Sequence, residues 1–280
     1  MSCRRNAQGR RTARGAVAVL GVIVVLVAVR ACADPIPRRP AGPMPPAPAD
    51  TVSVQRPDRI ERPPAEENEF PVILGSFSTT LIGSLPARTA NVRLAAAALD
   101  GAVLRPGDVL SFNREVGART RERGYRPAPV ILHESRQLQT GGGVCQVAST
   151  IFAAALLSGL SMAERHHHSS PVDYIPPGQD ATIAWGVKDL QVRNDLSQRV
   201  RLRVEVVGST LTARIEGEEP PGEAYEIETE ERGIPGDPGA GSAPGREIEV
   251  FLVRRTAGGA DRRDFLFRDV YPPARIAGAR

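Results

Sequence analysis

A cysteine, two histidines and an aspartate are the residues of this chain whose types and order could do chemistry. Cys145 comes first, His166 and His168 follow it, and Asp180 comes after them. A thiol needs a nearby base or a depressed pKa to attack an amide at neutral pH. The order therefore favours a cysteine nucleophile activated by one of the two histidines. Asp180 (or Asp173) would orient the imidazole.

A glycine-rich turn precedes the cysteine. Gly141, Gly142 and Gly143 run into an apolar segment over residues 144–157 that has helical spacing and no proline. Glycine lets the backbone adopt positive φ and pass close to a neighbour or a ligand. We therefore expect Cys145 on the first turn of a helix, where free N–H groups and the helix dipole favour a thiolate.

Three further residues are predicted to help bind a substrate. Gln146, or the backbone N–H groups at the helix start, could stabilise an oxyanion. Ser149 lies one turn after Cys145 on the same helix face, where it could also bond back to a helix carbonyl. Arg119 belongs to a polar stretch over residues 113–125 that predicts a loop, and it could bind an anionic group through two N–H groups.

Three other interpretations of the same residues stay open. Zinc accepts ligands such as Cys145, His166 and His168 with Glu164 or Asp180, but a His-x-His pair recurs by chance on strands. A non-catalytic domain would use the glycine turn and the helix start to bind a carboxylate or a phosphate. A satisfied polar cluster that only joins the helix to a sheet is the third. We predict neither a metal nor a cofactor.

The N-terminus has the form of an export signal. Residues 1–14 are rich in arginine and residues 16–29 are almost wholly apolar. Such a segment is either cleaved or retained as a short membrane anchor, and the residues before Cys32 also resemble a lipidation motif in which Arg30 is out of place. We therefore predict a signal peptide or membrane anchor over residues 1–34, with the rest of the chain outside the cytoplasm.

Composition divides the remainder of the chain. Residues 35–68 are rich in proline and predict an extended linker. One globular domain is expected over residues 69–216. Residues 217–245 are acidic and then rich in glycine and proline, which predicts a flexible loop, and residues 246–280 suggest a C-terminal strand hairpin.

The fold class is predicted as α+β, with mostly antiparallel strands packed on two main helices in one globular domain behind the N-terminal membrane or export segment. One helix is expected over residues 91–99 with Asn91 as its cap, and the other follows the glycine turn. On a strand over residues 162–168, His166 and His168 would share one face. The other strands are expected at residues 72–79, 109–112, 129–132, 200–207 and 211–215.

Charge and cysteine content exclude some classes of function. The formal net charge is +4, and much of the excess lies in the N-terminal arginines. No basic stripe is interleaved with aromatic residues, so nucleic acid is not an expected partner. Cys3 and Cys32 lie in the N-terminal segment, so the globular part has a single thiol and no disulfide. A lone thiol in an exported domain is either a small buried side chain or a functional group.

Several strings of residues carry a resemblance to a known family. The strings are Gly-Gly-Gly-Val-Cys-Gln-Val-Ala-Ser-Thr at 141–150, Glu-Arg-His-His-His-Ser at 164–169, Pro-Pro-Gly-Gln-Asp-Ala-Thr at 176–182, Phe-Ser-Thr at 77–79, Pro-Gly-Asp at 106–108, Gly-Ala-Arg-Thr at 117–120 and Asp-Val-Tyr-Pro-Pro at 269–273. Together they resemble the VanW-like family, and the similarity covers most of residues 70–207.

The resemblance implies a location rather than an activity. The family takes its name from an accessory protein of glycopeptide (vancomycin) resistance clusters, so it implies a protein of the bacterial cell envelope, extracytoplasmic and either membrane-anchored or secreted. The implied partners are peptidoglycan or its precursors, and the membrane through the N-terminal segment. We therefore expect a cysteine-dependent enzyme that acts on peptidoglycan amide bonds by hydrolysis or transpeptidation. The alternative is a non-catalytic domain that binds or scaffolds the cell wall.

Overall fold

The computed structural model describes residues 60, 69–132, 135–236, 242–256 and 258–273. The expected export segment over residues 1–34 lies outside the described residues, as does the proline-rich linker except for Ile60. Within the described part of the chain, no helix is long and apolar enough to cross a membrane.

The fold is α+β, and its strands are mostly antiparallel, as the sequence predicts. The main sheet has the strand order β1-β9-β8-β2, and each neighbouring pair is antiparallel. Its strands are β1 (Val72–Thr80), β2 (Ala102–Leu104), β8 (Val200–Val207) and β9 (Thr210–Gly217). Strands β8 and β9 form a hairpin around Gly208, whose φ of 58° suits the tight turn.

Two helices pack against this sheet and against each other. They are α1 (Pro86–Leu99) and α3 (Val144–Leu156). Every residue of α3 is buried except Cys145, so apolar residues dominate the helix, and its polar residues Gln146, Ser149 and Thr150 are buried as well. The largest fully buried side chains of the core include Leu99, Leu104, Phe112, Phe152, Leu190 and Leu202.

Shorter elements complete the domain. A three-stranded sheet has the order β3-β7-β6, and β4 pairs with β5. The short helix α2 contacts α1. The bounds of these elements are β3 (Val109–Ser111), α2 (Phe112–Val116), β4 (Pro127–Leu132), β5 (Ser135–Thr140), β6 (Ser161–Glu164) and β7 (Gln191–Arg193).

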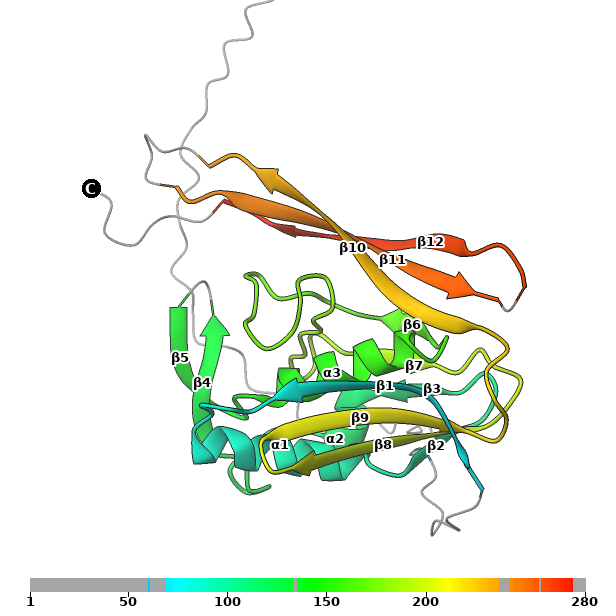
Figure 1. Cartoon of the computed structure of the whole chain (residues 1–280). Coiled ribbons are helices and arrows are strands. Elements are labelled where there is room, and N and C mark those ends of the chain that lie inside the picture. The colour runs from blue at the N-terminus through cyan, green and yellow to red at the C-terminus, as the bar shows by residue number, and fades with distance from the viewer. Residues whose placement is uncertain (1–59, 61–68, 133–134, 237–241, 257, 274–280) are drawn as a thin grey trace, which may run out of the picture. The chain divides into compact units, whose positions relative to one another are not determined.

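A further sheet, the C-terminal sheet, lies across α3 from the main sheet (Figure 1). It has the order β10-β11-β12, with bounds β10 (Ala224–Ile234), β11 (Gly245–Arg255) and β12 (Arg262–Tyr271). The rings of Phe152 on α3 and Phe267 on β12 lie 5.9 Å apart between centroids. Helix α3 is thus covered on two sides by sheets.

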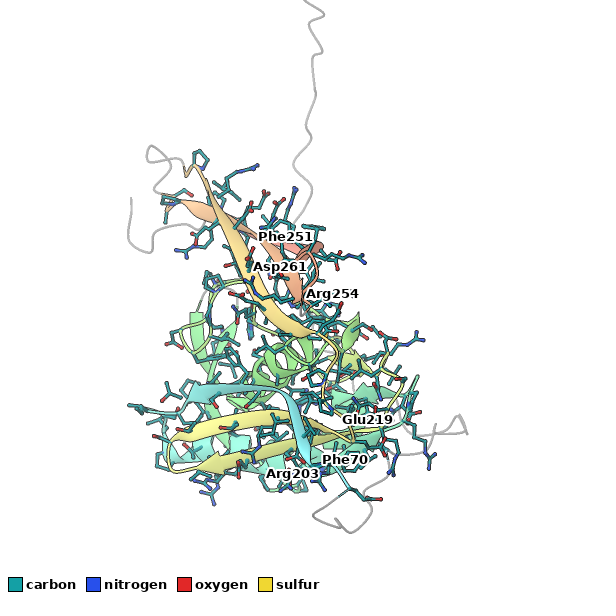
Figure 2. The ribbon with its side chains drawn as sticks, turned by 45° about the vertical axis from the view of Figure 1, so that its right-hand side comes forward. Phe70, Arg203, Glu219, Phe251, Arg254 and Asp261 are labelled. Atoms are coloured by element: carbon teal, nitrogen blue, oxygen red, sulfur yellow. The ribbon has the colours of Figure 1, made fainter. Side chains whose placement is uncertain are left out.

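The flexible loop predicted over residues 217–245 is wrong for its middle part, which forms β10. The expected C-terminal hairpin is therefore two strands of a three-stranded sheet. The glutamates that suggested a loop are held by arginines of β11 and β12: Arg255 contacts Glu226 at 2.6 Å and Arg263 contacts Glu228 at 2.9 Å. Figure 2 labels Phe251, Arg254 and Asp261 among the side chains of this part of the chain. Cross-strand ion pairs let an acidic strand form at an exposed sheet surface.

The start of α1 also differs from the prediction. Pro86 occupies the first turn, where its missing N–H has no cost, so the helix begins before Asn91. Asn91 is fully buried inside the helix. Its side chain donates to the carbonyl oxygens of Arg126 (2.8 Å) and Gly142 (3.0 Å), and accepts from the N–H of Arg126 (2.8 Å). Asn91 therefore ties α1 to the glycine turn.

The substitution Asn91→Ala should lower the free energy of unfolding by about 2–4 kcal/mol, because it removes three hydrogen bonds that a fully buried side chain makes to the backbone. Chemical denaturation followed by circular dichroism measures this change. The control is Arg93→Ala, on the exposed side of the same helix, for which we expect a change below about 0.5 kcal/mol. Equal effects from both substitutions would contradict the role assigned to Asn91.

Candidate active site

The glycine turn places Cys145 at the start of α3. Gly141 and Gly143 have φ of 87° and 99°, which side chains rarely adopt. A Cβ on Gly142 would lie 2.4 Å from the carbonyl oxygen of Ala128. All three positions therefore require glycine, and the turn delivers the one partly exposed residue of α3 to the surface.

The sulfur of Cys145 lies among polar groups of another segment. It is 3.8 Å from Oγ1 of Thr182 and 3.7 Å from the carbonyl oxygen of Ile183. Burial by itself raises the pKa of the Cys145 thiol, but a hydrogen bond with His168 and its positive charge outweigh burial and lower the pKa to about 7. The environment thus favours a thiolate near neutral pH.

His168 is held by Asp180. Its Nδ1 lies 2.5 Å from Oδ2 of Asp180, and its backbone N–H donates to the same oxygen at 2.8 Å. This leaves Nε2 as the ring nitrogen for Cys145. Burial lowers the pKa of His168, but the partners Asp180 and Cys145 raise it to about 9. Between about pH 7 and pH 9 the thiolate and the imidazolium coexist.

His168 is the histidine that lies beside Cys145, whereas His166 lies beside Glu164. The strand expected over residues 162–168 ends at Glu164, after a register shift against β7. The two histidines therefore do not share a strand face. Nε2 of His166 lies 2.9 Å from Oε1 of Glu164, and its side chain is 38% exposed.

Gln146 and Ser149 are both engaged in holding the site together. The amide nitrogen of Gln146 donates to Thr79 Oγ1 (3.0 Å) and to the Thr80 carbonyl oxygen (2.9 Å), so the oxyanion role expected of this side chain lacks a free N–H. The Ser149 hydroxyl donates back to the Cys145 carbonyl oxygen (2.9 Å) and accepts from the N–H of Ala181 (2.9 Å). Ser149 thereby joins α3 to the segment that carries Asp180.

Arg119 and Arg88 flank the cysteine. Burial lowers the pKa of both arginines, and the charge of Cys145 acts in the opposite direction on each. Arg119 donates to Oδ1 of Asn113 (2.7 Å) and lies over the ring of Trp185. Arg88 donates to Oε1 of Gln146 at 2.6 Å. Two guanidinium groups therefore stand near the thiol.

Metal binding finds no support in this arrangement. Across residues 69–132, 135–236, 242–256 and 258–273, no group of three or more His, Cys, Asp and Glu side chains could hold a metal ion. His168 and Asp180 bond to each other, and His166 bonds to Glu164. The two histidines and the two carboxylates that the zinc interpretation considers are thus distributed over two separate pairs.

Comparison with known proteins supports the resemblance. Residues 87–216 match the family model described as VanW like protein. The chain carries a VanW-like domain. It is 37% identical over 169 residues to the uncharacterized protein YoaR of Bacillus subtilis (strain 168), which covers 56% of this chain and 55% of that protein.

A second relative is the vancomycin B-type resistance protein VanW of Enterococcus faecalis (strain ATCC 700802 / V583). The identity is 28% over 142 residues, covering 49% of this chain and 52% of that protein. The chain spans about half the length of both curated relatives. No solved structure matches the chain.

The matched segment of the VanW-like domain contains Cys145, His168 and Asp180, together with Arg88 and Arg119. Sequence reasoning missed Arg88, because its distance along the chain from Cys145 gives no signal. It also missed Tyr174, whose hydroxyl lies 3.3 Å from Ser149 Oγ and whose pKa is raised by burial and by Cys145.

Two other arginines lie away from the thiol. Arg93 is exposed and donates to the carbonyl oxygens of Val206 and Gly208. Arg165 is bonded to Asp269 on β12, outside the matched segment. Neither is placed to bind a group that reacts with Cys145.

The pair of Cys145 and His168 predicts a specific pH profile. The alkylation rate of Cys145 by iodoacetamide should rise with pH through a midpoint near 7, since only the thiolate reacts. In His168→Gln the midpoint should move above about 8, because the positive charge that stabilises the thiolate is gone. Mass spectrometry of the tryptic peptide of residues 137–165 separates Cys145 from Cys3 and Cys32.

The neighbouring histidine provides the matched control for this profile. His166→Gln should leave the midpoint unchanged, because His166 bonds to Glu164. A shift of equal size in both variants, or a midpoint in the unmodified protein near that of an ordinary thiol, would contradict the pairing of His168 with Cys145.

Proposed function

We propose that the VanW-like domain is a cysteine-dependent enzyme that acts on peptidoglycan amide bonds by hydrolysis or transpeptidation. The observation that carries the proposal is the chain of contacts from Cys145 through His168 to Asp180. A nucleophile, a base within hydrogen-bonding reach of it and a carboxylate that orients the base are the recurring parts of acyl-transfer sites.

The first half of the reaction forms a thioester. The Cys145 thiolate attacks the amide carbonyl carbon, and the negative charge moves to the carbonyl oxygen. When the intermediate collapses, the C–N bond breaks and the leaving amine takes a proton from Nε2 of His168. The acyl group then remains on the sulfur, and Asp180 keeps its hydrogen bond to Nδ1 of His168 throughout.

The second half returns the thiolate. Water or an acceptor amine loses a proton to Nε2 of His168 and attacks the thioester carbonyl. The C–S bond breaks, giving a free acid in hydrolysis or a new amide in transpeptidation, and the thiolate and imidazolium re-form. The two outcomes differ only in the acceptor, so the same residues serve both.

The start of α3 supplies the groups that would stabilise the oxyanion. Cys145 is the second residue of the helix, and the N–H groups of Val144 and Gln146 on either side of it donate to the carbonyl oxygens of Gly141 (3.2 Å) and Gly143 (3.0 Å). This leaves the N–H group of Cys145 itself, and the helix dipole favours a negative charge at this end. This role therefore belongs to the backbone, since the side chain of Gln146 is bonded to Thr79 and Thr80.

The substrate class is supported by Arg88 and Arg119. Their hydrogen bonds go to neutral oxygens, those of Gln146, Ser84, Asn113 and Gly117, while Asp173 acts on Arg88 and Asp189 on Arg119 through charge alone. Peptidoglycan stem peptides carry carboxylates, which match guanidinium groups in charge and geometry. An extracytoplasmic site at the cell envelope, anchored or secreted through the N-terminal segment, would give the domain access to them.

The direct test uses purified peptidoglycan. The full chain should release or join stem peptides that are detected by mass spectrometry, and Cys145→Ser should reduce the yield on the order of a thousandfold. His166→Gln should retain activity, because His166 is bonded to Glu164 rather than to the cysteine. If peptidoglycan stays unchanged with the unmodified protein, and Cys145→Ser binds it equally well, the domain is a non-catalytic cell-wall binding module.

A second prediction concerns the arginines. Arg119→Gln should raise KM about tenfold for an acidic stem peptide, since an ionic hydrogen bond contributes about 1.5–3 kcal/mol. KM for the same peptide with its carboxylates amidated should change little. The control Arg93→Gln removes an exposed arginine of α1 that contacts Val206 and Gly208. An equal rise in KM for both peptides would exclude carboxylate recognition by Arg119.

A further inference from the structure

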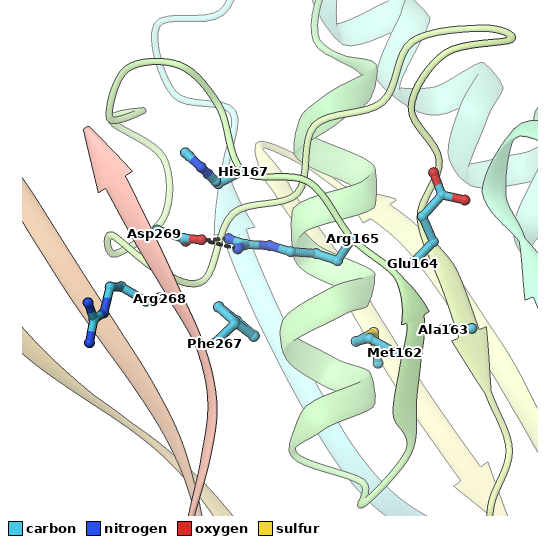
Figure 3. A pocket seen from close by; sticks show the side chains of 8 residues that line it. All are labelled: Met162, Ala163, Glu164, Arg165, His167, Phe267, Arg268 and Asp269. Carbon is cyan, nitrogen blue, oxygen red and sulfur yellow. Dashed lines mark hydrogen bonds and ion pairs between the residues drawn. The ribbon is translucent and has the colours of Figure 1, made fainter. Parts of the chain in front are cut away.

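Strand β12 reaches the candidate site through a buried ion pair. Nη1 of Arg165 lies 2.5 Å from Oδ1 of Asp269, and Nη2 lies 2.7 Å from Oδ2, so the pair is bidentate (Figure 3). The side chains are 7% and 2% exposed. The guanidinium lies over the rings of Phe152 and Phe267. Such a pair is geometrically rigid, and removing one partner is costly.

The same arginine holds the backbone of Asp180. Its Nε and Nη2 both donate to the Asp180 carbonyl oxygen, at 2.8 Å and 2.5 Å. Nη2 also lies 3.3 Å from Oδ1 of the Asp180 carboxylate. Asp269 neutralises Arg165, and this matters because an unpaired guanidinium at that place would compete with His168 for the carboxylate.

A second residue of β12 contacts the Asp180 side chain directly. The Tyr271 hydroxyl donates to Oδ1 of Asp180 at 3.0 Å, while Oδ2 is bound by His168. The two oxygens thus have different partners, which fixes the rotation of the carboxylate. Burial, with the charges of Asp180 and Asp269, raises the pKa of Tyr271 far above its usual range, so it stays a donor.

We infer that β12 is a positioning element of the active site, in which Asp269 and Tyr271 hold Asp180 in the orientation that His168 requires. The inference rests on the proposed function for its catalytic meaning. Both residues lie outside the segment 87–216 that matches the family model. The C-terminal sheet is therefore part of the site rather than an appendage to the VanW-like domain.

The charged groups around Asp180 account for the expected effect. His168 faces it from the segment after β6, Arg165 from the same segment, and Tyr271 and Asp269 from β12. Loss of the Tyr271 hydroxyl leaves Oδ1 with Nη2 of Arg165, 3.3 Å away, as its remaining partner, so the carboxylate turns further towards Arg165. Loss of the Asp269 charge strengthens the attraction of Arg165 for Asp180. Both changes weaken the interaction of Asp180 with the His168 imidazolium. The imidazolium then stabilises the Cys145 thiolate less.

The experiment measures the pH profile of Cys145 alkylation by iodoacetamide in the full chain. Tyr271→Phe keeps the ring that packs on His167, and Asp269→Asn keeps the shape of the side chain. Each should raise the alkylation midpoint by about one pH unit, so that the rate at pH 6 falls about tenfold. The control is Tyr225→Phe on β10 of the same sheet, which removes a hydroxyl that donates to Glu223; it should leave the midpoint in place.

The outcomes separate this inference from the proposed function. An unchanged or lowered midpoint in Tyr271→Phe, with a thermal unfolding temperature close to that of the unmodified protein, overturns the positioning role. If Asp269→Asn fails to fold, Tyr271→Phe decides alone, because it removes one oxygen and no charge. An ordinary thiol midpoint in the unmodified protein would instead overturn the proposed nucleophile, whatever the variants do.

Discussion

The carboxylate of Asp180 is the constraint on which the rest of the site depends. It is almost fully buried, and burial alone would raise its pKa and neutralise it. His168 and Arg165 reverse this and lower the pKa. As long as Asp180 is ionised, it keeps His168 charged, and the charged His168 keeps Cys145 a thiolate. Each charge in the series Asp180, His168 and Cys145 is thus stable only because the neighbouring charge in the series is present.

The packing of α3 explains how Cys145 and Asp180 are held at fixed positions relative to each other. The helix is buried between the main sheet and the C-terminal sheet, and only Cys145 emerges from it. Ser149, one turn later, bonds to Ala181, the neighbour of Asp180. Cys145 and the carboxylate of Asp180 are therefore fixed to the same rigid body. A buried helix tolerates few rearrangements, because protein interiors are close-packed.

The sequence predicts the local parts of this arrangement and not the long-range ones. The glycine turn, α3 and the position of Cys145 follow from residue types and helical spacing within residues 141–157. The choice between His166 and His168 does not, because the strand period is broken at Glu164. The contact of Tyr271 with Asp180 joins distant segments, and no periodicity encodes it. Likewise the acidic sequence of β10 predicts a loop, because the arginines of β11 and β12 that pair with its glutamates are distant along the chain.

The arginines around Cys145 and Asp180 separate into two kinds by their partners. Arg165 is neutralised by Asp269 and packed between two aromatic rings, so its charge serves the fold around Asp180. Arg88 and Arg119 donate to neutral oxygens near Cys145, and burial lowers their pKa values. The charge of Asp173 acts on Arg88 and that of Asp189 on Arg119, and a Cys145 thiolate raises the pKa of both arginines. Burial still lowers both pKa values, so a further anionic group beside either guanidinium would be stabilised.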